Sequence, residues 1–391
     1  MPRAPPRPLQ RLAALAQIST MKRYAAFDPP EYVAWTPDEA ERERFDATIS
    51  HHPERAAIIE SLGQPQRLDL YRGLVRTRLI DVALKRFVKQ GVISKAWLGT
   101  GEEAATVGPV HALRRGPNAD IVAPMIRNSG ACNEMGMPAA DVFRAYMGTA
   151  DGPSHGRDGH YGDFSRGILP PVSIVGDCAA VATGIALAMQ AQKRDNVVLT
   201  WIGDGSTKAG VFHEGLNFAA VRRVPAIFII QNNQVALGTR LAQHHLTPEP
   251  ESFASWPKAY GVWGGVFDGN NVLDGYALTS IAAERCRKGE GPALLIAETF
   301  RMGGHATHDE QEARRTFDAE LFGAWGRRDP IATFEEWLIS RGITREQLEA
   351  AEHEVESEVD GAEEEALASR AANMPRGEDA LSGVYSSEKQ S

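Results

Sequence analysis

The sequence predicts an α/β protein whose doubly wound, mostly parallel sheet carries helices on both faces. Short runs rich in β-branched and aromatic residues alternate with helical runs, which is typical of a parallel sheet covered by helices. The strongest of these runs leads directly into a glycine-flanked aspartate, as expected at the ligand-binding edge of such a sheet. The length of 391 residues accommodates one large α/β domain with extensions at both ends.

Composition and charge exclude two classes of partner. The chain has 42 basic and 51 acidic side chains and a net charge of −9, which is the wrong sign for a protein dedicated to the phosphate backbone of nucleic acid. Its longest apolar run, residues 224–230, contains a proline and is far shorter than the roughly 20 residues of a membrane span. We therefore expect neither a nucleic-acid partner nor a membrane partner.

The cysteines indicate the compartment. Cys132, Cys178 and Cys286 are odd in number, lie far apart and form no C-x-x-C pair, so the sequence supports neither a disulfide framework nor a cysteine-based zinc site. A reducing compartment fits this pattern, and we expect the bacterial cytoplasm rather than the mitochondrial matrix.

Residues 1–67 are interpreted as an amino-terminal arm that is partly disordered. The first 27 residues contain five basic side chains, four prolines and no acidic side chain. We expect a disordered leader, with Met21 as an alternative start, and a removable targeting segment is the competing interpretation. Residues 28–66 are polar and predict two short helices separated by loops.

Residues 68–328 carry the predicted α/β domain. From Leu68 the apolar residues recur at helical spacing until Gly91 ends the run. Residues 211–222 form a helix-like stretch between two of the strands. The predicted strands cover residues 197–202, 226–231, 264–268 and 292–300. Residues 329–391 are helical and acidic and end in a loose tail, which predicts a carboxy-terminal helical segment.

Two strand ends carry the candidate metal site. The first strand runs into Asp204, and the second ends in Asn232 and Asn233, 29 residues later. In a βαβ unit this separation brings adjacent strand ends together. An aspartate repels a bare phosphate, but Mg²⁺ between them resolves the repulsion because it takes hard oxygen ligands and shares its shell with phosphate oxygens. The pattern lacks G-x-G-x-x-G and G-K-[ST], which disfavours dinucleotide and nucleoside-triphosphate sites.

The same residues resemble the thiamine diphosphate (ThDP) fingerprint. Residues 203–239 resemble the alpha subunit of the first, decarboxylating component of 2-oxo acid dehydrogenase complexes, a group that includes pyruvate, branched-chain 2-oxo acid and acetoin types. The resemblance extends over residues 68–385, and its supporting segments are residues 89–108, 267–310 and 329–338. It implies the ThDP-binding fold and a requirement for ThDP and Mg²⁺.

The resemblance also implies roles for individual residues. Asp204, Asn233 and the backbone carbonyl of Val235 would hold Mg²⁺. The residues that would bind the diphosphate are Gly203, Gly205, Ser206, Arg127, Arg301 and His305. His305 is also the expected catalytic histidine. Cations beyond the metal are needed because the cofactor carries two phosphates.

Two further positions are expected beside the aminopyrimidine ring of the cofactor. Ser173 and Val175 match backbone positions that meet this ring, and Val175 would also be the apolar wedge that bends the cofactor. In the two-chain enzymes the beta subunit supplies the glutamate that activates the ring, and Glu102 and Glu103 align with a different family segment. The resemblance therefore implies a beta subunit in an α2β2 heterotetramer, a lipoyl-bearing acyltransferase that accepts the acyl group, and a 2-oxo acid substrate.

Several positions depart from the pyruvate-type pattern. Trp97 stands where pyruvate-type relatives tend to carry a histidine, and Ile126 and Ser129 replace polar or ionisable residues. Ala306 replaces a regulatory serine. We predict a pocket that favours branched-chain 2-oxo acids over pyruvate. An acetoin-cleaving alpha subunit and a catalytically silent ThDP-binding scaffold remain alternatives.

Overall fold

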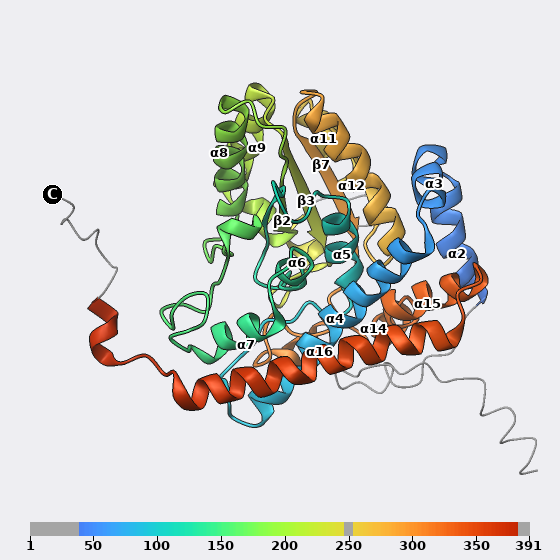
Figure 1. Cartoon of the computed structure of the whole chain (residues 1–391). Helices are drawn as coiled ribbons and strands as arrows, with labels where there is room; N and C mark the ends of the chain where they lie inside the picture. The colour runs from blue at the N-terminus through green and yellow to red at the C-terminus, as the bar shows by residue number, and fades with distance from the viewer. Residues whose placement is uncertain (1–38, 246–252, 382–391) are drawn as a thin grey trace, which may run out of the picture.

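A five-stranded parallel sheet forms the centre of the molecule (Figure 1). The computed structural model describes residues 39–245 and 253–381. Within these residues every neighbouring pair of strands in the sheet is parallel, in the order β1-β2-β3-β7-β6. The strands are β1 (Ile121–Ala123), β2 (Val198–Gly203), β3 (Ala226–Asn232), β6 (Trp263–Asp268) and β7 (Ala293–Glu298). The four predicted strands and the predicted fold class are confirmed, and the short strand β1 was not predicted.

Helices cover both faces of the sheet because the strand side chains alternate in direction. Leu199 and Trp201 on β2 join one apolar cluster, whereas Val198 and Ile202 join the cluster on the opposite face. The first cluster lies under α4 (Gln64–Lys89), α5 (Glu103–His111) and α12 (Val272–Arg287), and the second under α8 (Asp177–Ala191), α9 (Gly210–Arg222) and α11 (Trp256–Ala259). The two groups of helices flank the strands in Figure 1.

The crossover between β2 and β3 positions the candidate metal site. Helix α9 connects these strands, as residues 211–222 predicted, and the two strands pair in parallel with Gly203 opposite Gln231. The carboxyl ends of both strands therefore meet at one edge of the sheet, and Asp204 and Asn233 follow directly.

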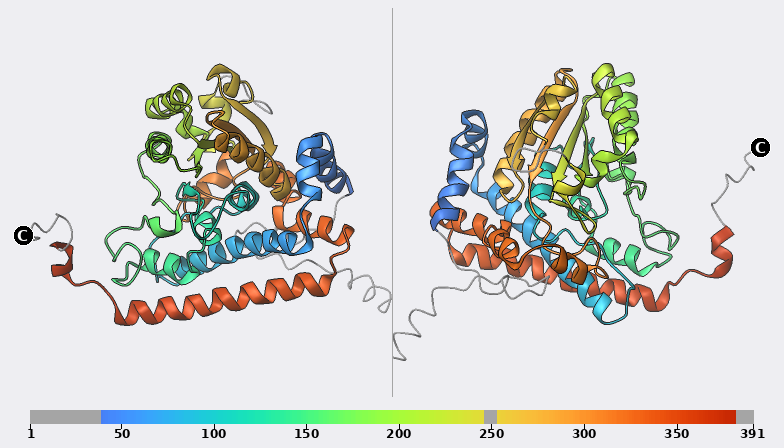
Figure 2. Two further views of the ribbon diagram at one scale, coloured as in Figure 1. Left: turned by 45° about the horizontal axis from the view of Figure 1, so that its top comes forward. Right: turned by 180° about the vertical axis from the view of Figure 1, so that it is seen from behind.

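The two ends of the described chain pack against each other around α4. Two short helices, α2 (Glu39–Ser50) and α3 (Pro53–Glu60), precede α4, as predicted for the arm. At the other end, α15 (Pro330–Ser340) and the long α16 (Arg345–Ala372) contribute apolar residues to the same core cluster as α4. Helix α16 runs alongside α4 in both views of Figure 2. The predicted leader and the end of the tail lie outside the described residues.

The remaining elements are short and connect these layers. They are α6 (Gly130–Glu134), α7 (Ala139–Met147), α10 (Leu241–His244), α13 (Glu310–Thr316), α14 (Ala319–Gly326), the hairpin strands β4 (Val235–Ala236) and β5 (Thr239–Arg240), and the 3-10 turns η2 (Phe164–Arg166), η3 (Gly205–Lys208) and η4 (Gly377–Leu381). In the described part of the chain, none of the helices has the length and apolar character needed to cross a bilayer. The three cysteines are buried and free.

Candidate active site

The carboxyl end of β2 holds a buried and incompletely paired carboxylate. Asp204 is 2% exposed, and its Oδ1 accepts a 2.8 Å hydrogen bond from the backbone N–H of Gly205. Its Oδ2 accepts no hydrogen bond within the described structure, and the nearest imidazole nitrogen, on His244, lies 3.8 Å away. Burial raises the pKa of Asp204 to about 6, although the Gly205 N–H and the charges of Arg127 and Arg301 oppose this shift. A bound cation would stabilise the charged form of this carboxylate.

The neighbouring strand end brings a second oxygen donor close to this carboxylate. Asn233 is 1% exposed and leads through Gln234 into the β4–β5 hairpin, where Val235 lines the cavity. Gln234 and Leu237 both have positive φ angles, of 74° and 53°. Non-glycine residues adopt this backbone conformation at a cost, and such strain concentrates at functional sites. The hairpin lies against the loop after β2, where Ala236 contacts Gly205.

The two asparagines of the pair have different partners. The Asn232 amide donates a 2.7 Å hydrogen bond to Glu298 on β7, so it belongs to the sheet. The Asn233 amide nitrogen instead donates a 2.9 Å hydrogen bond to Glu102 Oε1. This bond assigns the amide so that Oδ1 is the acceptor atom, which accepts a 3.4 Å hydrogen bond from the backbone N–H of Val235 and keeps a second lone pair available to a metal.

Glu102 is a site residue that the sequence alone did not reveal. It is 1% exposed, and its Oε1 also accepts a 2.5 Å hydrogen bond from Gln231, while its Oε2 has no hydrogen-bond donor within the described structure and lies 3.5 Å from Arg127 Nε. Glu103 points elsewhere and forms a buried ion pair with Arg78. A buried polar Gln231 at the end of an apolar strand was the only sequence signal for this network.

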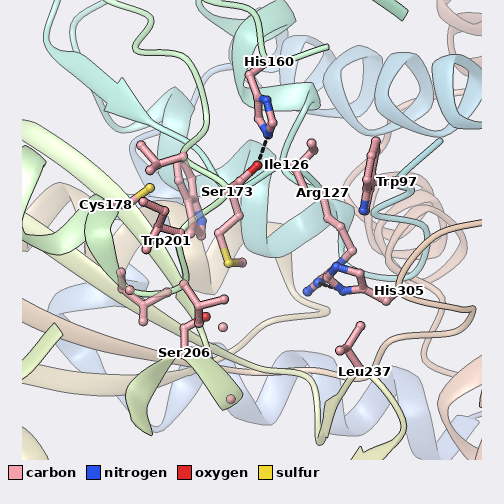
Figure 3. Close-up of a pocket in the computed structure, with 18 of the residues that line it drawn as sticks. Trp97, Ile126, Arg127, His160, Ser173, Cys178, Trp201, Ser206, Leu237 and His305 are labelled. Atoms are coloured by element: carbon pink, nitrogen blue, oxygen red, sulfur yellow. Dashed lines mark hydrogen bonds between the residues drawn. The ribbon is translucent and has the colours of Figure 1, made fainter. Parts of the chain in front are cut away.

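Basic residues converge on the same place from two loops. Arg127 follows β1, and its Nη1 donates a 3.2 Å hydrogen bond to His305 Nδ1 (Figure 3 shows both side chains together). Burial and the charges of Arg127 and Arg301 lower the pKa of His305 to about 3, so the imidazole is neutral. With Nδ1 accepting, the hydrogen is on Nε2, which is then a donor. The neutral donor His305 and the cation Arg127 lie side by side, an arrangement that can bind an anionic group.

Arg301 is close to these residues, but its hydrogen bonds hold the loops in place. Its Nε donates to the carbonyl of Gly303 at 2.9 Å and its Nη2 to the carbonyl of Leu237 at 2.7 Å. Its Nη1 is buried without a hydrogen-bond partner in the described structure. Burial is the main reason that the pKa of Arg301 falls to about 10. Direct contact of Arg301 with a diphosphate stays a prediction.

The unpaired atoms test whether ThDP and Mg²⁺ fit these residues. Each of the following is buried and lacks a hydrogen-bond partner within the described ranges: Asp204 Oδ2, Glu102 Oε2, Arg127 Nε and Arg301 Nη1. Glu102 Oε2 and Arg127 Nε lie 3.5 Å apart and form an ion pair, which leaves Asp204 Oδ2 and Arg301 Nη1 as the acidic and the basic atom that fit a cation held together with an anion. No group of three or more His, Cys, Asp and Glu side chains in residues 39–245 and 253–381 could hold a metal. A metal at Asp204 would therefore depend on amide and carbonyl oxygens, as Asn233 and Val235 offer.

A cavity of about 770 Å³ opens beside these groups. Nine of the predicted site residues line it: Arg127, Ser173, Val175, Gly203, Asp204, Gly205, Ser206, Val235 and His305. A side chain at Gly205 would place its Cβ 2.4 Å from the Cβ of Ala236, so only glycine allows the hairpin to approach this closely. Val175 is 57% exposed, and its role as an apolar wedge stays a prediction. Asn233 and Arg301 do not line the cavity but contact the backbone of residues that do, Val235 and Leu237. A metal-ligand role for Asn233 stays a prediction.

The substrate side of the cavity is only partly as predicted. Trp97 and Ile126 line it, but Ser129 is buried behind the wall. The wall also contains His160 and Lys95, which the sequence analysis did not single out. Lys95 Nζ lies 4.9 Å from the centre of the Trp97 ring. The cavity therefore combines an apolar surface with two groups that can carry positive charge.

The chain is similar to known proteins over most of its length. A family described as "Dehydrogenase E1 component" matches residues 71–374. The 3-methyl-2-oxobutanoate dehydrogenase subunit alpha of Mycobacterium tuberculosis (strain ATCC 25618 / H37Rv) is 34% identical over 281 residues, which cover 72% of each chain. The 2-oxoisovalerate dehydrogenase subunit alpha of Bacillus subtilis (strain 168) is 32% identical, with 74% of this chain and 86% of the relative covered. The pyruvate dehydrogenase E1 component subunit alpha of Acholeplasma laidlawii is 33% identical, with 75% and 81% covered.

Proposed function

The chain belongs to the dehydrogenase E1 component family, and from this premise we propose that it is the alpha subunit of the decarboxylating component of a 2-oxo acid dehydrogenase complex. The enzyme would oxidatively decarboxylate a 2-oxo acid and pass the acyl group to a lipoyl group. One observation carries the proposal. The unpaired carboxylate oxygen of Asp204 and the Arg127–His305 pair face the same cavity, which provides for a cation and an anionic group together.

The family is ThDP-dependent, and the residues of this chain fit that cofactor. Mg²⁺ would be held by the Asp204 carboxylate, the Asn233 amide oxygen and the Val235 carbonyl. The expected ligands of the diphosphate are the backbone N–H groups of Gly205 and Ser206 and the side chains of Arg127 and His305, supported by Gly203 and Arg301. When bound, the cofactor supplies an electron sink that lets CO₂ leave from the substrate.

The protein side chains would position the reaction and exclude water from it. Glu102 fixes the Asn233 amide and lies against Arg127, so it holds one metal ligand and one diphosphate ligand in register. Neutral His305 would donate a hydrogen bond from Nε2 to the diphosphate without repelling Arg127. Trp97 and Ile126 provide an apolar wall that keeps water from the reacting carbon.

A beta subunit would complete the active site and form an α2β2 heterotetramer with this chain. The backbone around Ser173 and Val175 would meet the aminopyrimidine, whose activating glutamate would come from the beta subunit. Ile174 and Val175, which face this side, are 66% and 57% exposed in the isolated chain. Apolar side chains exposed at the mouth of a cavity indicate a surface that a partner covers. A lipoyl-bearing acyltransferase would receive the acyl group.

Reconstitution tests the proposal. The chain is co-expressed with its beta subunit and assayed with ThDP, Mg²⁺ and a dye acceptor on pyruvate, 3-methyl-2-oxobutanoate and acetoin. We expect turnover of a 2-oxo acid, preferably the branched one, and loss of turnover in Asp204→Ala. Preferential cleavage of acetoin would identify the acetoin type, and assembly without turnover of any of the three would identify a scaffold.

A further inference from the structure

A chain of hydrogen bonds joins the protein surface to the cavity wall through three residues. Asp158 Oδ1 lies 2.7 Å from His160 Nδ1, and His160 Nε2 lies 2.6 Å from Ser173 Oγ. All three residues line the cavity, and Figure 3 shows His160 and Ser173 on the side opposite Ser206. None of the roles above uses these side chains, because Ser173 is expected to meet the cofactor through its backbone.

The first hydrogen bond fixes the tautomer of His160. A carboxylate only accepts hydrogen bonds, so the hydrogen between Asp158 and His160 belongs to Nδ1. The backbone N–H of His160 also donates to Asp158 Oδ1, at 3.1 Å, which anchors the carboxylate on the same residue. Burial opposes this charge, but the hydrogen bonds from His160 hold the pKa of Asp158 below its ordinary value. In the neutral imidazole Nε2 therefore carries a lone pair and accepts the hydroxyl hydrogen of Ser173.

Protonation of His160 would reverse the second hydrogen bond. Once Nε2 carries a hydrogen it donates to Ser173 Oγ, and the hydroxyl hydrogen of Ser173 becomes available to a group in the cavity. The Asp158 side chain is 62% exposed and that of His160 is 23% exposed, so the imidazole can exchange protons with solvent. The other titratable groups that line the same cavity are Lys95, Arg127, Tyr146, Cys178, Asp204 and His305.

We propose that Ser173 is a substrate-binding residue whose hydroxyl acts as donor or acceptor according to the protonation of His160, with Asp158 as the positioning residue. The inference rests on the proposed function. Every oxygen of a 2-oxo acid, on the carboxylate or the oxo group, is a hydrogen-bond acceptor. Such a substrate favours the donor form of Ser173, so its binding is coupled to the uptake of one proton by His160. Ser173 and His160 thus provide the polar contact to the substrate that the apolar Trp97 and Ile126 cannot make.

Steady-state kinetics of the reconstituted enzyme test the coupling between about pH 5 and 8, where histidine titrates. We expect the KM for the 2-oxo acid to rise with pH in the wild type. Ser173→Ala and His160→Gln should raise KM about three- to tenfold at the acidic end, the effect of one hydrogen bond, and should flatten its pH dependence. The kcat should change less than KM, and Ser173→Thr, which keeps the hydroxyl, should retain the pH dependence.

His155→Gln is the matched control. His155 lies in the same segment and is exposed, and its Nδ1 donates to the carbonyl of Ala150 at 3.0 Å. This variant should keep both the wild-type KM and its pH dependence. A wild-type enzyme that turns over 2-oxo acids while His160→Gln and Ser173→Ala leave the pH dependence of KM unchanged would overturn the inference and leave the proposed function standing.

A second measurement does not depend on activity. Nitrogen NMR of the full chain with ¹⁵N-labelled histidine, with the signal of His160 identified from His160→Gln, reports which ring nitrogen carries the hydrogen. We expect the Nδ1–H form in the wild type and its loss in Asp158→Asn, while ThDP binding stays within twofold, which is about 0.4 kcal/mol. An Nε2–H form in the wild type would overturn the inference. An enzyme inactive on every 2-oxo acid would overturn the proposed function and, with it, the substrate role of Ser173.

Discussion

At the scale of single residues, Arg127 and His305 should contribute unequally to cofactor binding. Arg127 is permanently charged and can bind phosphate oxygens with two N–H groups, whereas burial and neighbouring arginines keep His305 neutral, with a pKa of about 3. Arg127→Ala should weaken ThDP binding by about tenfold or more, and His305→Ala should weaken it less. Calorimetric titration with ThDP and Mg²⁺ measures both, and exposed Arg314→Ala is the control. Equal affinities in the wild type and both variants would remove these residues from the site.

Asp204 should be essential for the metal but should not stabilise the empty chain. Its carboxylate is buried, and Oδ2 has no hydrogen-bond donor in the described structure, so the charged form is disfavoured until a cation binds. Asp204→Asn should therefore abolish Mg²⁺-dependent ThDP binding without lowering the thermal midpoint of the cofactor-free chain. Asn233→Ala should also lose binding. Wild-type affinity in these variants would contradict the assignment, and a midpoint lower by several degrees would show that the charge is structural.

Nine of the predicted site residues line one cavity, because motif spacing and the family resemblance select residues at strand ends and loops that the parallel sheet brings together. Their roles toward a metal and a diphosphate stay predictions. The sequence did not predict Glu102, since nothing in the chain order shows that residue 102 reaches the amide of Asn233. His160 was missed because it lies in an irregular segment without periodicity. Asp158 and Ser173 give it a role only through tertiary contact. A side chain whose role depends on a partner distant in sequence can be identified only from the three-dimensional structure.

At the scale of elements, the packing of α4, α15 and α16 contains a pH-sensitive cluster. Tyr71 donates a 2.5 Å hydrogen bond to Glu352 and lies 3.3 Å from Glu335. Burial, and next the negative charge of Glu352, raises the pKa of Glu335 from 4.5 to about 8, with Arg345 opposing. The folded chain thus holds a proton that the unfolded chain releases. The contribution of this proton to stability is full below pH 4.5 and is lost as the pH rises through about 8.

Replacing this carboxyl by an amide should remove that pH dependence. The thermal midpoint of the wild type should fall between about pH 5 and 8, and Glu335→Gln should reduce this fall by at least about 2 °C, the effect of roughly 1 kcal/mol in a chain of this size. Differential scanning fluorimetry across the pH range measures it. Glu349→Gln, an exposed change on α16, is the control. A wild-type slope identical to that of Glu335→Gln would show that the cluster does not titrate in this range.

The elements themselves were predictable to different degrees. Strands β2, β3 and β7 are recognisable in the sequence as apolar runs, and their residues are buried on both faces of the sheet. Strand β6 lies at the edge of the sheet and is only partly buried. Strand β1 has only three residues, too few for any pattern to stand out, yet it places Arg127. The contact of α16 with α4 was not predicted either, because the buried face of this acidic helix consists largely of small residues and includes two glutamates, so the helix resembles a solvated one.

At the scale of the whole molecule, the face around α8 and α9 should bind the beta subunit. These helices lie side by side (Figure 1), and Val181, Phe218 and Val221 on them are 38%, 46% and 70% exposed. Obligate interfaces commonly bury more than about 2,000 Å² and are apolar. Val221→Asp should weaken assembly by about tenfold or more, because it would place a charge where the beta subunit is expected to cover the valine. Co-purification and analytical ultracentrifugation measure this, with Leu367→Asp on α16 as the control.

The isolated chain should also be catalytically silent, since it lacks the glutamate expected from its partner. It should bind ThDP weakly, and full turnover should appear only with the beta subunit, at two cofactors per heterotetramer. Turnover by the purified chain alone would contradict the two-chain arrangement, and unchanged assembly in Val221→Asp would place the interface elsewhere.

The substrate preference follows from the shape of the assembled pocket, and Trp97 is the residue that tests it. The indole and Ile126 give the substrate side of the cavity an apolar wall. 3-Methyl-2-oxobutanoate has two more carbons than pyruvate, and burying each is worth roughly 0.8 kcal/mol, so together they favour it by about tenfold. Trp97→His replaces this wall by the polar group of the pyruvate-type pattern. It should lower kcat/KM for 3-methyl-2-oxobutanoate by about tenfold and change that for pyruvate less. A wild-type preference for pyruvate of tenfold or more, about 1.4 kcal/mol, would mean that the indole fills the pocket instead of lining it.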